Sequence, residues 1–117
     1  MNEYRTLEVW KKSMNLVADL YRIIKILPSE ERFAIADQMR RAAISIPLNI
    51  AEGQGRKSIK EYVHFLSISR GSLYEIETLL LLCVQLNYIA ENELTDIFKQ
   101  IDEISKILTA MINKLNI

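Results

Sequence analysis

Apolar side chains recur every three or four residues along most of the chain, a spacing that is typical of amphipathic helices. Polar segments separate four such stripes from one another. The spacing predicts helices over about residues 7–27, 29–52, 58–86 and 94–115, joined by connections of about two to five residues. Because short connections force neighbouring helices to be antiparallel, we expect an all-α fold, an antiparallel up-down-up-down four-helix bundle.

Each stripe predicts which side chains face the core. In order along the chain, the stripes are Leu7, Trp10, Met14, Val17, Tyr21 and Ile24; Phe33, Ala36, Met39, Ala43, Ile46 and Ile50; Tyr62, Phe65, Leu66, Ser69, Leu73, Ile76, Leu80 and Cys83; and Leu94, Ile97, Phe98, Ile101, Ile104, Leu108, Met111 and Leu115. The first helix carries a second apolar side of Leu16, Leu20, Ile23 and Leu27, and residues 79–84 are apolar throughout. A second apolar face on a bundle helix favours an oligomer, although a thick core accounts for part of it.

Several residues predict where the helices begin, bend and end. Ser29 is the expected N-cap of the second helix, and Pro47 should kink that helix because it removes a backbone donor. Gly53 and Gly55 should stop it. Ser58 with Glu61 fits a capping box at the start of the third helix, and Asn87 can adopt the left-handed conformation that ends it.

Composition narrows the class of protein. The chain has 117 residues, half of them apolar, with 15 basic and 15 acidic side chains. These values exclude disorder for the bulk of the chain and suit one domain over residues 1–117. The longest apolar run is far shorter than the roughly 20 residues that span a bilayer. A single cysteine and an N-terminus without a secretory signal lead us to expect a cytoplasmic protein.

The zero net charge hides an asymmetry along the chain. Residues 1–70 carry an excess of basic groups and residues 71–117 an excess of acidic ones. The expected topology gathers basic side chains at one end of the bundle, namely Arg5, Lys11, Lys12, Arg56, Lys57, Lys60 and Lys114. In an oligomer this end would form a rim that could bind a polyanion. The alternative is an ordinary solvated surface.

The segment 53–58 combines two glycines, two cations and the start of a helix, which are features that can bind phosphate. It lacks the spacing of a P-loop, and no strand precedes it. Phosphate-backbone contact by Arg56, Lys57 and Lys60 is one interpretation, because such contacts require cations but no fixed geometry. A plain two-glycine turn is the other.

The sequence gives little support for an enzyme. The single histidine, His64, and the single cysteine, Cys83, lie about 28 Å apart on one helix and cannot form a dyad within one chain. Glu61 and His64 match one Glu-x-x-His step of a di-metal bundle, but such a site needs two steps and further glutamates. We therefore expect no catalytic residues, no metal and no cofactor, with a surface histidine and a core cysteine.

Charged and amide side chains also interrupt the apolar pattern in the middle helices. Because an unpaired charge in the core is costly, we expect a structural polar network of Asn49, Glu52, Arg70 and Glu75, in which Arg70 or Arg41 pairs with a glutamate. Ser45 or Asn49 should satisfy carbonyls freed at Pro47. Arg40 and Arg41 point about 100° apart, so at least one should reach solvent or a partner.

Two segments, residues 38–53 (QMRRAAISIPLNIAEG) and 70–75 (RGSLYE), closely resemble the bacterial four-helix-bundle family of 23S rRNA intervening-sequence proteins. The opening LEVW at residues 7–10 and the turn LNYI at residues 86–89 resemble it too, so the similarity extends over almost the whole chain. Leu48 stands where the family usually has a small polar residue, and Asn87 replaces a usual glycine.

The resemblance implies a small bundle without known catalysis. A related branch, the accessory variability protein of diversity-generating retroelements, forms pentamers and binds nucleic acid and a reverse transcriptase. By resemblance we expect a homopentamer whose nucleic-acid contacts fall on Arg40, Arg41, Arg56, Lys57, Lys60, Lys11 and Lys12. Three hypotheses follow: a non-catalytic, oligomeric nucleic-acid-binding protein that contacts structured RNA through the basic end of the bundle; a scaffold that recruits a protein partner; and a metal-dependent enzyme using His64.

Overall fold

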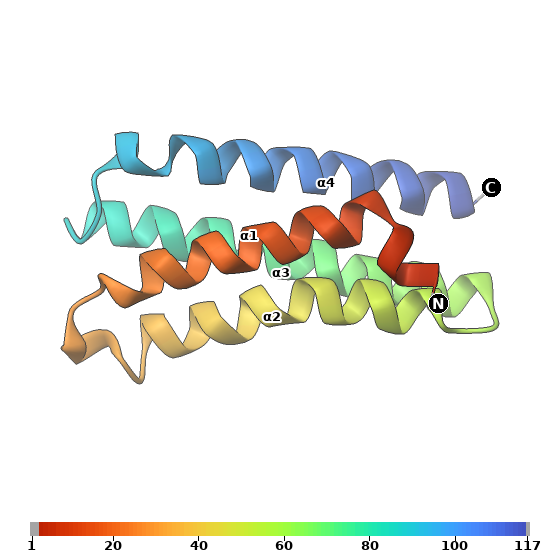
Figure 1. Cartoon of the computed structure of the whole chain (residues 1–117), viewed down its shortest axis with the longest axis horizontal. Coiled ribbons are helices and arrows are strands. Elements are labelled where there is room, and N and C mark those ends of the chain that lie inside the picture. Colours follow the sequence, from red (N-terminus) through yellow and green to blue (C-terminus); the bar gives the residue numbers. More distant parts are fainter. Residues whose placement is uncertain (1–2, 117) are drawn as a thin grey trace.

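A computed structural model describes residues 3–116 and contains four long helices packed side by side (Figure 1). They are α1 (Glu8–Lys25), α2 (Ile35–Gln54), α3 (Ile59–Gln85) and α4 (Thr95–Leu115). Short 3-10 helices precede three of them: η1 (Glu3–Thr6), η2 (Ser29–Glu31) and η3 (Glu91–Leu94). Successive helices run in opposite directions, and α1 also packs against α4 (Figure 1). The predicted all-α, up-down-up-down bundle is confirmed.

The core consists of aliphatic side chains contributed by all four helices. Those that are completely buried include Leu16 and Leu20 of α1, Met39, Ile46 and Ile50 of α2, Leu66, Leu73, Ile76 and Leu80 of α3, and Ile104 and Leu108 of α4. The predicted stripes of the third and fourth helices supply most of their buried residues. The spacing identified these buried residues, although α3 is apolar on more than one side, since Tyr74 and Leu81 on its outer side are about half exposed.

The prediction for α1 was correct only in part about which side chains face the core. Ile24 of the first side is buried, but so are Leu16 and Leu20 of the second side, whereas Met14 of the first side is 46% exposed. Trp10 and Val17 are only partly buried, and they face a groove beside α2. Both sides have helical spacing, so periodicity could not choose between them. The packing of α1 against both α2 and α4 decided it.

The start of α2 also differs from the prediction. Ser29 begins the 3-10 turn η2 rather than capping α2, which starts six residues later at Ile35. Phe33 therefore lies in the turn and is 84% exposed instead of buried. The Glu31 carboxylate accepts a long hydrogen bond from the Ile35 N–H at 3.5 Å and another from the Tyr88 hydroxyl at 2.7 Å. Glu31 thus ties this turn to the connection between α3 and α4.

The other helix ends follow local chemistry more closely. The Ser58 hydroxyl accepts a hydrogen bond from the Glu61 N–H at 3.1 Å and caps α3, and Asn87 has the positive φ of 64° expected after that helix. α2 continues through Pro47 and past Gly53 to Gln54. Gly55 is the C-cap, so the prediction that the two glycines stop the helix is confirmed for Gly55 but wrong for Gly53, which lies inside the helix. A Cβ there would lie 2.8 Å from the Phe65 Cβ, so this glycine lets α2 and α3 approach closely.

Candidate nucleic-acid interface

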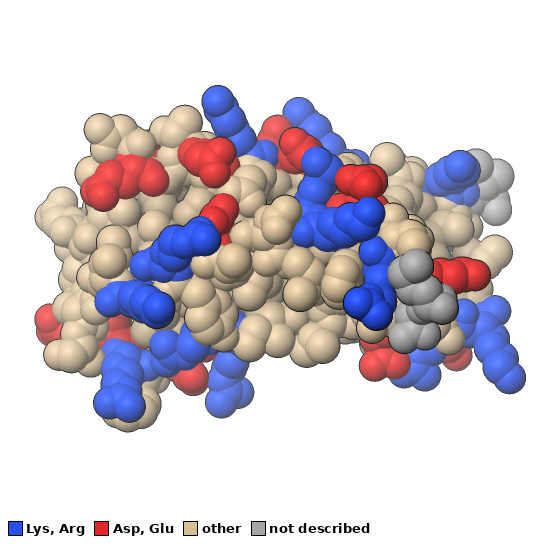
Figure 2. All heavy atoms as spheres, viewed as in Figure 1, with Lys and Arg blue, Asp and Glu red and all other residues tan. Residues whose placement is uncertain are grey.

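The seven predicted nucleic-acid contacts do not form one surface. Arg56, Lys57 and Lys60 lie at the turn between α2 and α3, at the end of the bundle that also holds both termini (Figure 1). About 20 Å of helix separates Arg41 from that turn. Figure 2 shows basic and acidic side chains interleaved along the visible face rather than a continuous basic patch. The set therefore divides into three groups: the three cations of the α2–α3 turn, the pair Lys11 and Lys12 on α1, and the pair Arg40 and Arg41 on α2.

Arg56 is held in place by two neighbours. Its Nη2 lies 2.9 Å from Glu52 Oε2, and its guanidinium lies 4.9 Å from the centre of the Phe65 ring. The ion pair offsets the charge of Arg56, and the ring fixes its direction. Arg56 is consequently less available to a phosphate than its position at the turn suggests.

Lys11 and Lys12 are likewise paired within the chain. Lys11 lies 3.7 Å from a Glu8 carboxylate oxygen, and Lys12 pairs with Glu103 across the α1–α4 seam. The hydrogen bond and charge of Glu103 raise the pKa of Lys12. Both lysines remain partly exposed, but a nucleic acid would have to compete with a carboxylate for each.

Lys57 and Lys60 differ from these three residues. Both are exposed, and within residues 3–116 neither takes part in an ion pair. They flank the Ser58 cap, where the first backbone N–H groups of α3 carry the positive end of the helix dipole. Arg5 and Lys114, at the same end of the bundle, are also without an ion pair among the described residues.

Arg40 and Arg41 lie on α2 toward the opposite end. The Arg40 Nη2 donates to the Arg32 carbonyl at 3.1 Å, and the Arg41 Nε lies 3.2 Å from Asp37 Oδ2. Both side chains reach the surface, as predicted for at least one of them. Their distance from the α2–α3 turn separates them from Lys57 and Lys60.

The predicted polar network has different partners. Arg70 donates to the Thr109 hydroxyl at 3.2 Å instead of pairing with a glutamate, and Glu52 pairs with Arg56. Glu75 is exposed and needs no buried partner, because it lies on the outer side of α3. The sequence shows that these residues lie on the two middle helices. It does not show the direction in which each side chain points around its helix axis, so it could not identify which of them face each other.

A hydrogen-bonded cluster of small polar residues occupies the α2–α3 contact instead. The Ser69 hydroxyl donates to the Ile46 carbonyl at 2.8 Å, and the Ser72 hydroxyl donates to the Ser45 hydroxyl at 2.9 Å. Asn49 donates to both oxygens of Ser45 at 2.8 Å. The prediction that Ser45 or Asn49 satisfies a carbonyl freed at Pro47 is not confirmed, because the carbonyl that loses its helical donor at Pro47 is that of Ala43, whereas Asn49 donates to the carbonyl of Ser45. Ser72 was missed because a serine on an apolar helix gives no periodic signal.

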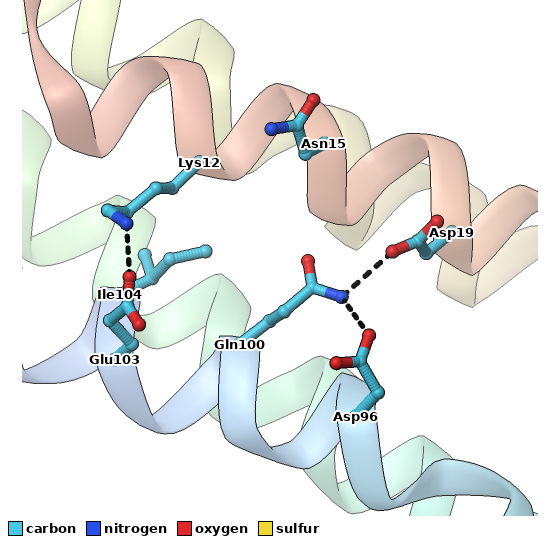
Figure 3. Close-up of a pocket in the computed structure, with 7 residues that line it drawn as sticks. All are labelled: Lys12, Asn15, Asp19, Asp96, Gln100, Glu103 and Ile104. Atoms are coloured by element: carbon cyan, nitrogen blue, oxygen red, sulfur yellow. Dashed lines mark hydrogen bonds and ion pairs between the residues drawn. The ribbon is translucent and has the colours of Figure 1, made fainter.

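A polar groove of about 310 Å³ follows the seam between α1 and α4 (Figure 3). The Gln100 side-chain N–H groups donate to Asp19 at 2.8 Å and to Asp96 at 2.9 Å, and Lys12 and Glu103 close one end. Gln100 thereby bridges the two carboxylates. The arrangement joins the first and last helices through polar contacts at the surface.

His64 and Cys83 occupy unrelated environments on α3. His64 is exposed and packs edge-on against Phe65, with ring centres 5.5 Å apart. Cys83 is buried, and burial together with the Glu31 charge raises the pKa of its thiol. Within residues 3–116, no three His, Cys, Asp or Glu side chains are grouped so that they could hold a metal ion. None of the described helices is long and apolar enough to cross a membrane.

The fold and its surfaces define a small helical-bundle protein with charged ends and exposed apolar sides. The family model of the 23S rRNA-intervening sequence protein matches residues 5–110, so the chain belongs to that family. It is also similar to a solved structure from Bacteroides thetaiotaomicron, a protein of unknown function from the S23 ribosomal protein family. The two are 28% identical with a TM-score of 0.82, over 89% of this chain and 97% of the other. No curated protein matches the chain.

Proposed function

We propose that this protein is a non-catalytic, oligomeric nucleic-acid-binding protein that contacts structured RNA through the bundle end containing the α2–α3 turn. The observation that carries the proposal is the pair of exposed lysines, Lys57 and Lys60, on either side of a helix N-terminus with no carboxylate partner in the described chain. Arg5 and Lys114 add positive charge at the same end. Cations of this kind bind phosphates and release counterions.

Oligomerisation strengthens the proposal because one protomer offers few free cations. Several copies arranged around an axis would present this end repeatedly to one RNA, and simultaneous contacts raise the overall affinity. A homopentamer is the assembly we propose, in keeping with the resemblance to the retroelement accessory protein.

The test is binding of the purified protein to a structured RNA and to a duplex DNA across a salt series, with the molar mass measured by light scattering. K57A/K60A is expected to weaken RNA binding and to reduce the slope of log K against log salt by about one for each lysine that contacts a phosphate. K25A/K99A is the matched control, since Lys25 and Lys99 are exposed and unpaired within residues 3–116 but lie toward the other end.

Absence of binding at low salt would overturn the RNA-binding proposal. Equal losses in the test and control variants would overturn the assignment to the α2–α3 turn. A protein-interaction scaffold is the second candidate, favoured by the apolar groove between α1 and α2 and by exposed Phe33. The scaffold is supported if nucleic acid does not bind and a purified protein partner binds wild type but not a groove variant such as L48D.

A further inference from the structure

An apolar groove of about 380 Å³ lies between α1 and α2. Trp10 and Met14 line one wall, Ile44 and Leu48 line the other, and Pro47 lies between the walls. Leu48 is 61% exposed in the protomer. An apolar concavity of this kind is typical of a surface that another apolar group covers.

A protruding apolar surface lies on a different helix of the same chain. Tyr74 and Leu81 project from the outer side of α3 and are about half exposed, at 51% and 50%. α3 lies diagonally across the bundle from α1 (Figure 1), so this ridge and the groove do not compete for the same space. A concave and a convex apolar surface on separate sides allow a head-to-tail contact between identical copies.

Gly71 belongs to the ridge, one turn before Tyr74. Apart from its chain neighbours and the adjacent backbone of α3, no heavy atom of residues 3–116 lies within 4 Å of the position that a Cβ would occupy there, so packing inside the described protomer does not require glycine. Gly53 contrasts with it, because Phe65 fills the space beside that glycine. A helix interior disfavours glycine unless something approaches its backbone closely. The bare backbone at Gly71 therefore favours close approach by a second helix.

The charges beside the two surfaces are complementary. Glu75 and Glu77 follow Tyr74 on α3 and are exposed, and neither forms an ion pair within residues 3–116. Arg40 and Arg41 precede Ile44, a lining residue of the groove, by one turn of α2 and reach the surface, where Arg41 also pairs with Asp37 and Arg40 donates to the Arg32 carbonyl. Opposite charges around an apolar contact favour one partner and one register.

We infer that the Tyr74–Leu81 ridge of one copy occupies the α1–α2 groove of the next, with Glu75 and Glu77 facing Arg40 and Arg41. The inference rests on the oligomeric part of the proposed function and specifies its interface. Each copy uses its groove once and its ridge once, so the contact produces a closed ring when its rotation closes. Arg40 and Arg41 are then interface residues rather than nucleic-acid contacts.

Two single variants test the contact, L48D in the groove and L81D on the ridge. Both positions are exposed, so circular dichroism should show a wild-type helix content for each. Each variant alone is expected to be monomeric, because one of its two surfaces carries a charge. An equimolar mixture is expected to give a one-to-one dimer by light scattering, since each variant retains the surface that the other has lost.

Other outcomes overturn the inference in distinct ways. A wild-type oligomer that both variants leave intact shows that the protein assembles through other surfaces. Disruption by L48D alone shows a groove-to-groove contact. A monomeric wild type overturns the inference and the oligomeric part of the proposed function together, while RNA binding that depends on Lys57 and Lys60 is tested separately and can still hold.

Charge reversal provides an independent readout of the same contact. R40E/R41E and E75R/E77R are each expected to weaken assembly, so that the protomer concentration needed for half-maximal assembly rises by at least about tenfold. The fourfold variant is expected to recover assembly, because the opposite charges face each other again. Failure of the combination to improve on either pair would overturn the proposed register even if the groove and ridge variants behave as expected.

Discussion

Two glycines in similar helical settings have different roles at the scale of single residues. Gly53 lies where a Cβ would come within 2.8 Å of the Phe65 Cβ, whereas the space beside Gly71 is open. The first glycine permits close packing of α2 on α3. The second has no such role within the protomer, and the inferred contact between copies gives it one.

Substitution of these glycines by alanine should change stability in opposite directions. G53A is expected to lower the free energy of unfolding by about 1–3 kcal/mol because α2 and Phe65 must move apart. G71A is expected to raise it by about 0.5–1 kcal/mol, since alanine is the better helix former. Both changes in the free energy of unfolding can be measured by urea unfolding of variants that also carry L81D. Because L81D is expected to be monomeric, assembly then makes no contribution. A stabilising G53A would contradict the packing described here.

Tyr88 makes a residue-scale contact that depends on pH. Its hydroxyl donates to Glu31 at 2.7 Å, and this hydrogen bond, with burial and the nearby carboxylates, raises the pKa of Tyr88 to about 12 from 10.0. A raised pKa means that the stabilisation is complete below the ordinary value and is lost as pH rises through the folded value.

Wild type is therefore expected to unfold at a higher urea concentration than Y88F at about pH 8, and this advantage should shrink as pH rises from about 10 toward 12. Phenylalanine keeps the ring and removes the hydroxyl, so it is the suitable comparison. An advantage that stays constant over this range would show that the Glu31 hydrogen bond does not carry it.

Helix ends illustrate what local sequence determines at the scale of elements. Ser58 caps α3 as predicted, and Asn87 ends the same helix in the left-handed conformation. Ser29 was also predicted to be an N-cap, without a capping box, but it starts a separate 3-10 turn. Both serines precede acidic residues, and the difference lies in the chain after Ser29, where Glu31 turns to meet the Tyr88 hydroxyl.

S58A is expected to destabilise the protein by about 1 kcal/mol, because the Glu61 N–H loses its acceptor at the start of α3. S29A is the matched control and should change stability by less than about 0.5 kcal/mol, as an exposed serine without a capping bond. Chemical denaturation of the two variants measures the difference. Equal effects would mean that the Ser58 cap contributes little.

Assembly and nucleic-acid binding are connected at the scale of the whole molecule. The end with Lys57 and Lys60 offers few free cations in one protomer, so several copies must act together to hold an RNA firmly. The groove runs along α1 and α2 and reaches toward that end, where Tyr4 and Ala51 line it, but Lys57 and Lys60 are not among its lining residues. Assembly through the groove and the ridge therefore does not use these two lysines.

L48D is consequently expected to bind structured RNA at least about tenfold more weakly than wild type at the same protomer concentration, although Leu48 touches no part of the basic end. The mixture of L48D and L81D, as a dimer, should bind with intermediate affinity. Competition titration at one salt concentration gives all three values. Equal affinities for monomer and oligomer would show that each protomer binds RNA independently.

The amino-acid sequence by itself determined the number of helices, their approximate bounds, the Ser58 cap and the family, because these depend on spacing and on contacts between near neighbours in the chain. Tertiary structure decided which apolar side chains of α1 are buried, that Arg70 meets Thr109, and that Arg56, Lys11 and Lys12 are paired while Lys57 and Lys60 form no ion pair within residues 3–116. These features depend on the rotation of each helix about its axis. Several rotations satisfy one periodic pattern, and only packing against the neighbouring helices selects among them.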